Sequence, residues 1–410
     1  MTKLLQSTTV STGLAIFSML FGAGNLMYPL QVGMTSGDKI IWGIGCFILT
    51  AVILPVMGFV GMILFNGDYQ SFFYRLGRPV GSAAIFLCML VIGPLIAIPR
   101  ITTLSHTMIA PFLAGTPLGT ITYFSSCIFA LLFLGITFLV TYRENRIMSI
   151  LGTIISPLLL LSLAIIIIKG LLFHDGITHT DASILCVCKT NFMLGYETLD
   201  LVGALFLSSI VLGLIKTNVD AAIANNPRLL AYVALKASMI GVGLLSLVYV
   251  GMALLGMYHG YGLEHINAGE LFRAISHRVL GTSGAIVIAT AVLMACLSTA
   301  IALSAVVAEY LQKELFNKRI SFITALIMVL VASLPLSIAG LTAVLKLTGG
   351  LITYIGYPVL IVLTMVNVLY KLFGFRWAKL PVALTFVVVV LFHPDMQEHV
   401  QRIIQGFCSA

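Results

Sequence analysis

The chain consists largely of long apolar runs, which are separated by short polar segments. A helix needs about 20 apolar residues to cross the ~30 Å hydrocarbon core of a membrane. Only 9% of the residues are charged and 60% are hydrophobic, whereas about 25% of the residues in a soluble domain are charged. These features exclude a soluble enzyme, a secreted disulfide-stabilised domain and a disordered chain. We expect an all-α protein that crosses the membrane many times.

The apolar runs predict eleven crossings within a single membrane domain, 1–410. Run length places them at about 9–33, 40–65, 80–111, 119–141, 149–169, 194–215, 229–257, 281–310, 320–338, 344–370 and 378–393. The first run is too long for the apolar core of a cleaved signal peptide, so we expect it to be retained. The longer connecting segments are 170–193 and 258–280.

The net charge of +8 does not indicate a nucleic-acid partner, because no run of basic residues is longer than Lys318-Arg319. The positive charges instead predict how the protein is oriented. If the N-terminus is cytoplasmic, most of the 22 Lys and Arg residues lie on the cytoplasmic side. We therefore expect a cytoplasmic N-terminus.

The first apolar run contains residues that disfavour a continuous helix. Gly22 and Gly24 precede Asn25, and Pro29 follows within one turn. Small residues also allow membrane helices to pack closely, and this alternative stays open. Close packing, however, does not require the polar amide of Asn25.

The sixth run begins with a comparable anomaly. The sequence Gly195-Tyr196-Glu197-Thr198-Leu199-Asp200 precedes a short apolar stretch, and residues 184–194 leave room for at most a short half-helix. The alternative is a loop followed by a helix that is capped by Thr198 or Asp200. Both interpretations fit this segment.

The two anomalies open two successive groups of five crossings. Paired interruptions at corresponding positions are typical of inverted-repeat transporters. The free N-terminus of a half-helix suits a carboxylate, and a free C-terminus suits a cation. This arrangement predicts an amino acid substrate and a co-transported ion.

Two further polar features lie inside apolar runs. Ser298 and Thr299 are adjacent hydroxyls in the eighth run; such hydroxyls usually bond back to a carbonyl one turn earlier, but they could also bind a small cation. Arg100, in the third run, needs a carboxylate or carbonyls if it is buried, and Glu197 or Asp200 is the natural partner. The alternative is that the Arg100 side chain extends to the membrane surface.

These segments resemble the branched-chain amino acid:cation symporter family, the bacterial carriers of leucine, isoleucine and valine. The likeness rests on Met19-Leu20-Phe21-Gly22-Ala23-Gly24-Asn25-Leu26 with Pro29, Gly93-Pro94, Pro99-Arg100, residues 195–200 and Cys296-Leu297-Ser298-Thr299-Ala300. It implies the five-plus-five inverted-repeat fold of the broken-helix sodium-coupled amino acid transporters, with discontinuous first and sixth helices. It also implies sodium-driven import across the bacterial cell membrane (the inner membrane in a Gram-negative organism), without a cofactor.

The resemblance divides the chain into a first repeat (1–173), an extracellular loop (174–193), a second, inverted repeat (194–370), and an extra helix with a C-terminal tail (371–410). The family normally has a twelfth crossing, but nothing after Phe392 is long and apolar enough to form one. The oligomeric state stays open.

The resemblance also implies roles for individual residues. The substrate carboxylate would be bound by Gly22, Ala23, Gly24 and Asn25, and the pocket would be lined by Tyr196, Glu197 and Thr198. One sodium site would be formed by Ser18, Phe21, Ala295, Ser298 and Thr299, and a second by Leu20 and Asn25. Apart from the resemblance, the positions of Arg100, Glu197 and Asp200 in or at the ends of apolar runs make these residues candidate coupling or structural charges.

Three alternatives remain at this stage. One is a permease that exchanges or couples to protons, through Glu197 or Asp200, or carries another neutral amino acid. A membrane-embedded enzyme is not expected, because no H-E-x-x-H or serine-hydrolase motif is present and, of the eight His residues, only His106 lies in an apolar run. The third is a sensor that binds a substrate without transporting it.

Overall fold

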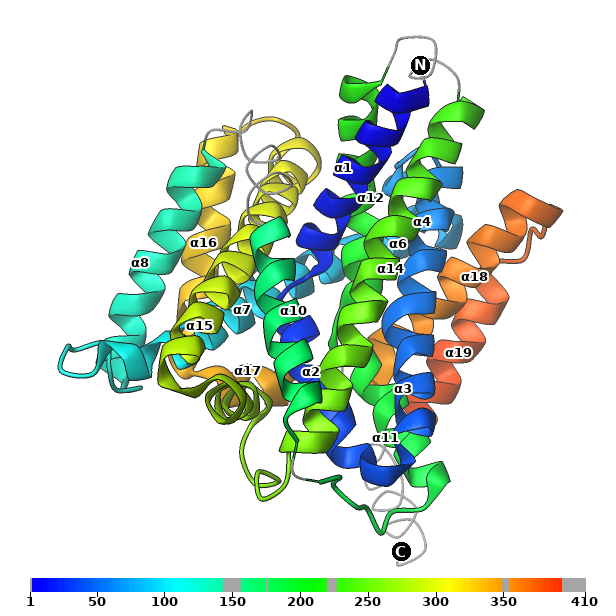
Figure 1. Ribbon diagram of the computed structural model, residues 1–410. Coiled ribbons are helices and arrows are strands. Elements are labelled where there is room, and N and C mark those ends of the chain that lie inside the picture. Colours follow the sequence, from blue (N-terminus) through cyan, green and yellow to red (C-terminus); the bar gives the residue numbers. More distant parts are fainter. Residues whose placement is uncertain (1, 143–155, 175, 220–226, 349–353, 393–410) are drawn as a thin grey trace, which may run out of the picture.

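The computed structural model describes residues 2–142, 156–174, 176–219, 227–348 and 354–392, and every regular element in these ranges is a helix (Figure 1). Among the described residues, eight helical segments are long and apolar enough to cross a membrane, and three shorter apolar helices accompany them. Each predicted crossing coincides with one or more of these helices. The prediction of an all-α membrane protein is therefore confirmed.

In the described part of the chain, the first five predicted crossings contain α1 (Thr2–Leu20), α2 (Ala23–Ser36), α3 (Ile40–Ile48), α4 (Leu54–Leu64), α6 (Arg78–Leu90), α7 (Ala97–Ile109), α8 (Tyr123–Thr141) and α10 (Ser156–Leu172). One π-helical turn, Leu49–Ile53, joins α3 to α4, and a second, Val91–Leu95, lies between α6 and α7. The short helix α5 (Tyr69–Phe73) connects the second and third crossings.

The remaining crossings contain α11 (Ile184–Glu197), α12 (Asp200–Asn218), α14 (Pro227–His259), α15 (Ala268–Tyr310), α16 (Phe322–Ala339), α18 (Tyr357–Phe373) and α19 (Lys379–Leu391). The short helix α17 (Leu341–Leu347) lies between α16 and α18. Local sequence explains several helix starts, since the side chains of Thr122, Ser183 and Ser321 each accept a backbone N–H of the helix that follows.

Two groups of helices stand side by side (Figure 1). In one group, α14 packs against α1 and α2, and α12 packs against α4. In the other group, α15 packs against α7, α8 and α16. Helix α15 also contacts α1 and α2, so it forms the boundary between the groups. The first and sixth crossings run in opposite directions, with α11 and α2 at one end and α1 and α12 at the other (Figure 1).

Glycines allow α2 and α14 to pack unusually closely. A Cβ atom placed on Gly33 would lie 1.8 Å from the carbonyl oxygen of Ala253. A Cβ atom on Gly256 would lie 2.0 Å from the carbonyl oxygen of Leu30. Both obstacles are backbone atoms, so this contact requires glycine on each helix.

The structure corrects several predicted boundaries. The predicted loop 174–193 is too long, because α11 begins at Ile184, where Ser183 caps it. The predicted connection 258–280 contains the first turns of α15, which bends at Gly281 (φ 68°) and only then enters the predicted eighth crossing. The predicted tenth crossing, 344–370, contains the end of α17 and most of α18, with a candidate span at Tyr354–Phe373, and residues 349–353 lie outside the described part of the chain.

The third crossing is also interrupted, which was not predicted. Gly93 has non-helical backbone angles (φ −101°, ψ −117°) and is followed by Pro94, which has no N–H to donate. The kink separates α6 from α7. It sets the direction of α7, the helix that carries Arg100.

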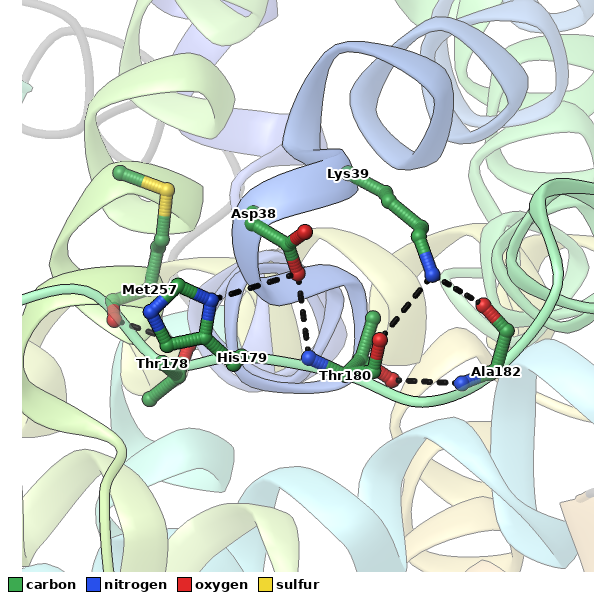
Figure 2. A network of polar contacts seen from close by, with 7 residues as sticks. All are labelled: Asp38, Lys39, Thr178, His179, Thr180, Ala182 and Met257. Carbon is green, nitrogen blue, oxygen red and sulfur yellow. Dashed lines mark hydrogen bonds and ion pairs between the residues drawn. The ribbon is translucent and has the colours of Figure 1, made fainter.

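A polar network fastens the segment after α10 to the junction of α2 and α3, outside the predicted crossings. Asp38 accepts the backbone N–H of Thr180 at 3.1 Å, and Lys39 donates to the carbonyls of Thr180 (3.0 Å) and Ala182 (2.7 Å) (Figure 2). The hydroxyl and backbone N–H of Thr178 both donate to the carbonyl of Met257 near the end of α14. The segment therefore links the junction of α2 and α3 to the end of α14.

The Thr180 N–H holds the pKa of Asp38 below its ordinary value of 3.8. The contact is therefore present at neutral pH and is lost only as the pH falls below that value. We expect Asp38→Ala to increase hydrogen exchange at the Thr180 amide at pH 7. In the control Glu264→Ala, which removes a carboxylate bonded to Gly262, exchange at Thr180 should be unchanged. Equal exchange in the wild type and Asp38→Ala would contradict this role.

Candidate functional site

The first and sixth crossings are discontinuous, as predicted. Helix α1 ends at Leu20 and α2 begins at Ala23, while α11 ends at Glu197 and α12 begins at Asp200. Leu199, between α11 and α12, has a left-handed backbone (φ 65°), which is uncommon for a residue other than glycine. The alternative of a loop leading into this helix is wrong, because α11 is a 14-residue helix. The Thr198 hydroxyl nevertheless accepts the first backbone N–H of α12, that of Asp200, at 3.4 Å.

The two interruptions lie next to each other. The Asn25 amide donates to both carboxylate oxygens of Asp200, at 2.9 and 3.0 Å, and to the Tyr249 hydroxyl at 2.5 Å. The Tyr249 hydroxyl in turn donates to Asp200 at 2.6 Å. All three side chains are at most 4% exposed. This network holds α2, α12 and α14 together where the helices are interrupted.

Five oxygen atoms from α1, the segment after it and α15 gather beside the first interruption. The Ser298 hydroxyl lies 3.5 Å from the carbonyl oxygen of Ser18 and 2.7 Å from that of Ala295. The Thr299 hydroxyl lies 3.2 Å from the carbonyl oxygens of both Phe21 and Ala295. Each hydroxyl therefore bonds within its own helix and also reaches the first crossing. Such a set of carbonyl and hydroxyl oxygens can coordinate a small hard cation.

Arg100 lies beside the second interruption. Its guanidinium donates to the carbonyls of Glu197 at 2.6 Å and Thr198 at 3.2 Å, and it lies 3.5 Å from the Tyr28 hydroxyl. The residue is 4% exposed, so the alternative in which its side chain extends to the membrane surface is wrong. The expected carboxylate partner is also wrong: in the described chain, no carboxylate oxygen lies within 4.0 Å of the guanidinium. The carbonyls at the C-terminus of α11 accept the hydrogen bonds of the guanidinium instead.

A cavity of about 40 Å³ lies between the interrupted helices. Its polar lining includes Asn25, Arg100 and Asp200, and its apolar lining comprises Met19, Leu20, Ile92, Ala97, Ile101, Leu199, Leu207 and Leu303. Gly22, Ala23, Thr198 and Thr299 also line it. The cavity therefore has both polar and aliphatic walls.

Some predicted site residues stand behind this lining. Tyr196 stacks on Tyr357 with the ring centres 5.0 Å apart, and Gly24 lies against Arg100 and Thr198. Glu197 contacts Arg100 through its carbonyl. The substrate and sodium roles of all these residues stay predictions.

The sequence analysis missed three buried tyrosines: Tyr28, Tyr249 and Tyr357. Tyr28 contacts Arg100, and the Tyr357 hydroxyl accepts the backbone N–H of Leu201 at 3.3 Å. A tyrosine within an apolar run was an available signal, because a buried hydroxyl needs a hydrogen-bond partner.

The fold is that of a broken-helix secondary transporter. The chain is similar to Mhp1, a nucleobase-cation-symport-1 family transporter, in its inward-facing conformation, with a TM-score of 0.60 and 15% identity over 96% of this chain and 91% of that one. It is also similar to a Na⁺-coupled sialic acid symporter, with a TM-score of 0.53 and 11% identity over 93% of this chain and 88% of that one.

The chain belongs to the branched-chain amino acid transport protein family, whose model matches residues 5–405. It is 30% identical to the branched-chain amino acid permease BraB of Bacillus subtilis, over 90% of this chain and 81% of that protein. It is 26% identical to the permease BrnQ of Escherichia coli, over 90% of this chain and 82% of that protein. The relatives are named as permeases and carriers, so the chain is a transporter and not an enzyme.

Proposed function

We propose that this protein imports leucine, isoleucine or valine together with Na⁺ by alternating access. The observation that carries the proposal is the set of five oxygens between the first interruption and α15. Three are carbonyls, from Ser18, Phe21 and Ala295, and two are hydroxyls, from Ser298 and Thr299. Unwound backbone beside a second helix is how transporters of this type bind Na⁺.

The lining of the cavity supports a branched aliphatic amino acid as substrate. Asn25, Arg100 and Asp200 supply polar groups for the charged end of an amino acid, and Ile92, Ile101 and other aliphatic side chains supply an apolar wall. The relatives named above are permeases for branched-chain amino acids. Burying an aliphatic side chain in such a wall contributes about 1.5–3 kcal/mol.

Alternating access requires the two helix groups to move relative to each other. A cavity of about 40 Å³ holds about three water molecules, at ~10–15 Å³ each. A branched-chain amino acid therefore enters only when the groups separate. In this proposal, residues 1–173 and 194–370 are inverted repeats, the N-terminus is cytoplasmic, and the protein resides in the bacterial cell membrane.

The test is uptake of radiolabelled leucine, isoleucine and valine into proteoliposomes with an imposed inward Na⁺ gradient. We expect accumulation of at least one of them, which stops when K⁺ replaces Na⁺. Failure to accumulate any of the three under either a Na⁺ or a proton gradient would reject the proposal. Accumulation driven only by a proton gradient would reject Na⁺ coupling alone.

The second candidate is proton coupling, with Asp200 or Glu197 as the proton carrier. It is favoured by the burial of Asp200, which is 4% exposed and whose carboxylate is hydrogen-bonded to Asn25 and Tyr249. A carboxylate within a membrane protein is costly and usually functional.

The variants Asp200→Asn and Glu197→Gln distinguish the two candidates, because each removes a titratable proton while keeping the shape of the side chain. If Na⁺ drives transport, we expect both variants to retain Na⁺-dependent uptake, with a reduced rate in Asp200→Asn because its network is disturbed. Uptake driven by a proton gradient in the wild type but not in one variant would instead identify that residue as the carrier.

A further inference from the structure

Arg100 has more hydrogen-bonding capacity than the structure uses. Its terminal nitrogens bond to the carbonyls of Glu197 and Thr198, but its Nε–H has no partner among the described residues. The side chain is 96% buried and lines the cavity between the interrupted helices. A buried N–H without an acceptor is unfavourable, so it requires an explanation.

The charge of Arg100 is not paired directly with a carboxylate, although the carboxylates of Glu197 and Asp200 are near enough to interact with it electrostatically. Since no carboxylate of the described chain lies within 4.0 Å, its partners are the two carbonyls at the C-terminus of α11. A helix terminus carries about half an elementary charge. The guanidinium therefore keeps the capacity to bind an anion.

The free N-terminus of α2 lies beside this guanidinium. Helix α2 begins after Gly22, which has no side chain to bond the N–H groups of the first turn. A Cβ atom on Gly24 would lie only 3.0 Å from a terminal nitrogen of Arg100. Both the first turn of α2 and Arg100 contribute to the lining of one cavity. A helix N-terminus and a cation that adjoin in this way favour an anion between them.

We propose that Arg100 binds the carboxylate of the transported amino acid together with the N-terminus of α2, and is therefore a specificity-determining residue. The inference rests on the proposed function, because an amino acid is the anion-bearing solute that this site would receive. In this structure the guanidinium donates to the carbonyls of Glu197 and Thr198. When substrate enters, its carboxylate becomes the stronger partner, because it carries a full negative charge and can accept two parallel N–H bonds from the planar guanidinium.

The test compares leucine with leucinamide, which keeps the amine and the side chain but lacks the carboxylate charge. Both displace radiolabelled leucine from purified protein in Na⁺-containing buffer. The wild type should prefer leucine. In Arg100→Gln we expect leucine to bind about 10- to 100-fold more weakly than in the wild type, whereas the affinity for leucinamide should change by less than about threefold. Arg100→Lys, which keeps the charge but loses the planar fork, should recover part of the preference.

Thr102→Val on the same helix is the matched control. The Thr102 side chain is buried and bonds only to the carbonyl of Ile98 within α7, so the preference for leucine should be unchanged.

Equal weakening of leucine and leucinamide binding in Arg100→Gln would show a purely structural role and overturn the inference. An unchanged preference for leucine over leucinamide in Arg100→Gln would also overturn it. If Arg100→Gln does not fold, the same comparison is made with Arg100→Lys. An affinity ratio of leucine to leucinamide equal to that of the wild type in this variant would overturn the inference. A wild type that binds neither leucine, isoleucine nor valine rejects the proposed function itself.

Discussion

Replacing both Ser298 and Thr299 by alanine is expected to raise the Na⁺ concentration needed for half-maximal leucine uptake by at least tenfold. The double variant removes two of the five oxygens and leaves only the carbonyls of Ser18, Phe21 and Ala295. Mutating residues that only hydrogen-bond to the ligands of a metal site typically lowers metal affinity about 10- to 100-fold. Removing atoms that contact the ion directly should lower it by at least as much. The measurement is the initial uptake rate in proteoliposomes over a series of Na⁺ concentrations.

Ser276→Ala is the matched control for this experiment. Ser276 is a buried serine on the same helix, α15, and its hydroxyl bonds only to the carbonyl of Phe272 within that helix. It should leave the Na⁺ dependence unaltered. If the double variant keeps the wild-type Na⁺ dependence, the cation does not bind between the first interruption and α15.

The second large effect is expected from Gly33→Ala. The added methyl group would lie 1.8 Å from the carbonyl oxygen of Ala253, and neither backbone can yield without separating α2 from α14. Overpacking of this kind typically lowers the free energy of unfolding by about 1–3 kcal/mol. We expect the upper end of this range, because the obstructing atoms belong to the backbone and cannot rotate away. We expect a clear decrease in the thermal unfolding temperature of the purified protein in detergent.

Gly45→Ala provides the comparison. Gly45 lies on the exposed side of α3, and a Cβ atom there meets nothing within 4 Å. Alanine is the better helix former, so the unfolding temperature should stay the same or rise slightly. A Gly33→Ala protein as stable as the wild type would mean that α2 and α14 do not pack as closely as described.

Much of the fold could be predicted because its signals are local. Apolar run length locates the crossings, and the glycines around Asn25 together with the polar residues before Leu199 mark both interruptions. The interruption at Gly93 was missed although Gly93-Pro94 was noted. One glycine followed by proline in a long apolar run is also compatible with a gently bent helix.

The partners of the site residues could not be predicted in the same way. Tyr249 meets Asn25 and Asp200 only because α14 packs against α2, and the sequence contains no local signal for that pairing. Arg100 was expected to pair with a carboxylate because charge is visible in a sequence. Its actual partners are carbonyls, which every residue has and which become available only where a helix ends.

The five oxygens beside the first interruption come from two different helix groups: Ser18 and Phe21 belong to the first crossing, and Ala295, Ser298 and Thr299 belong to α15. Under the proposed alternating access, these two sets would move relative to each other. Any displacement of one helix group against the other must pull this set apart. An ion held there would therefore favour the arrangement in which the groups are joined, and that arrangement would in turn bind the ion more tightly. Through this reciprocity, a difference in Na⁺ concentration across the membrane would supply the driving force for uptake.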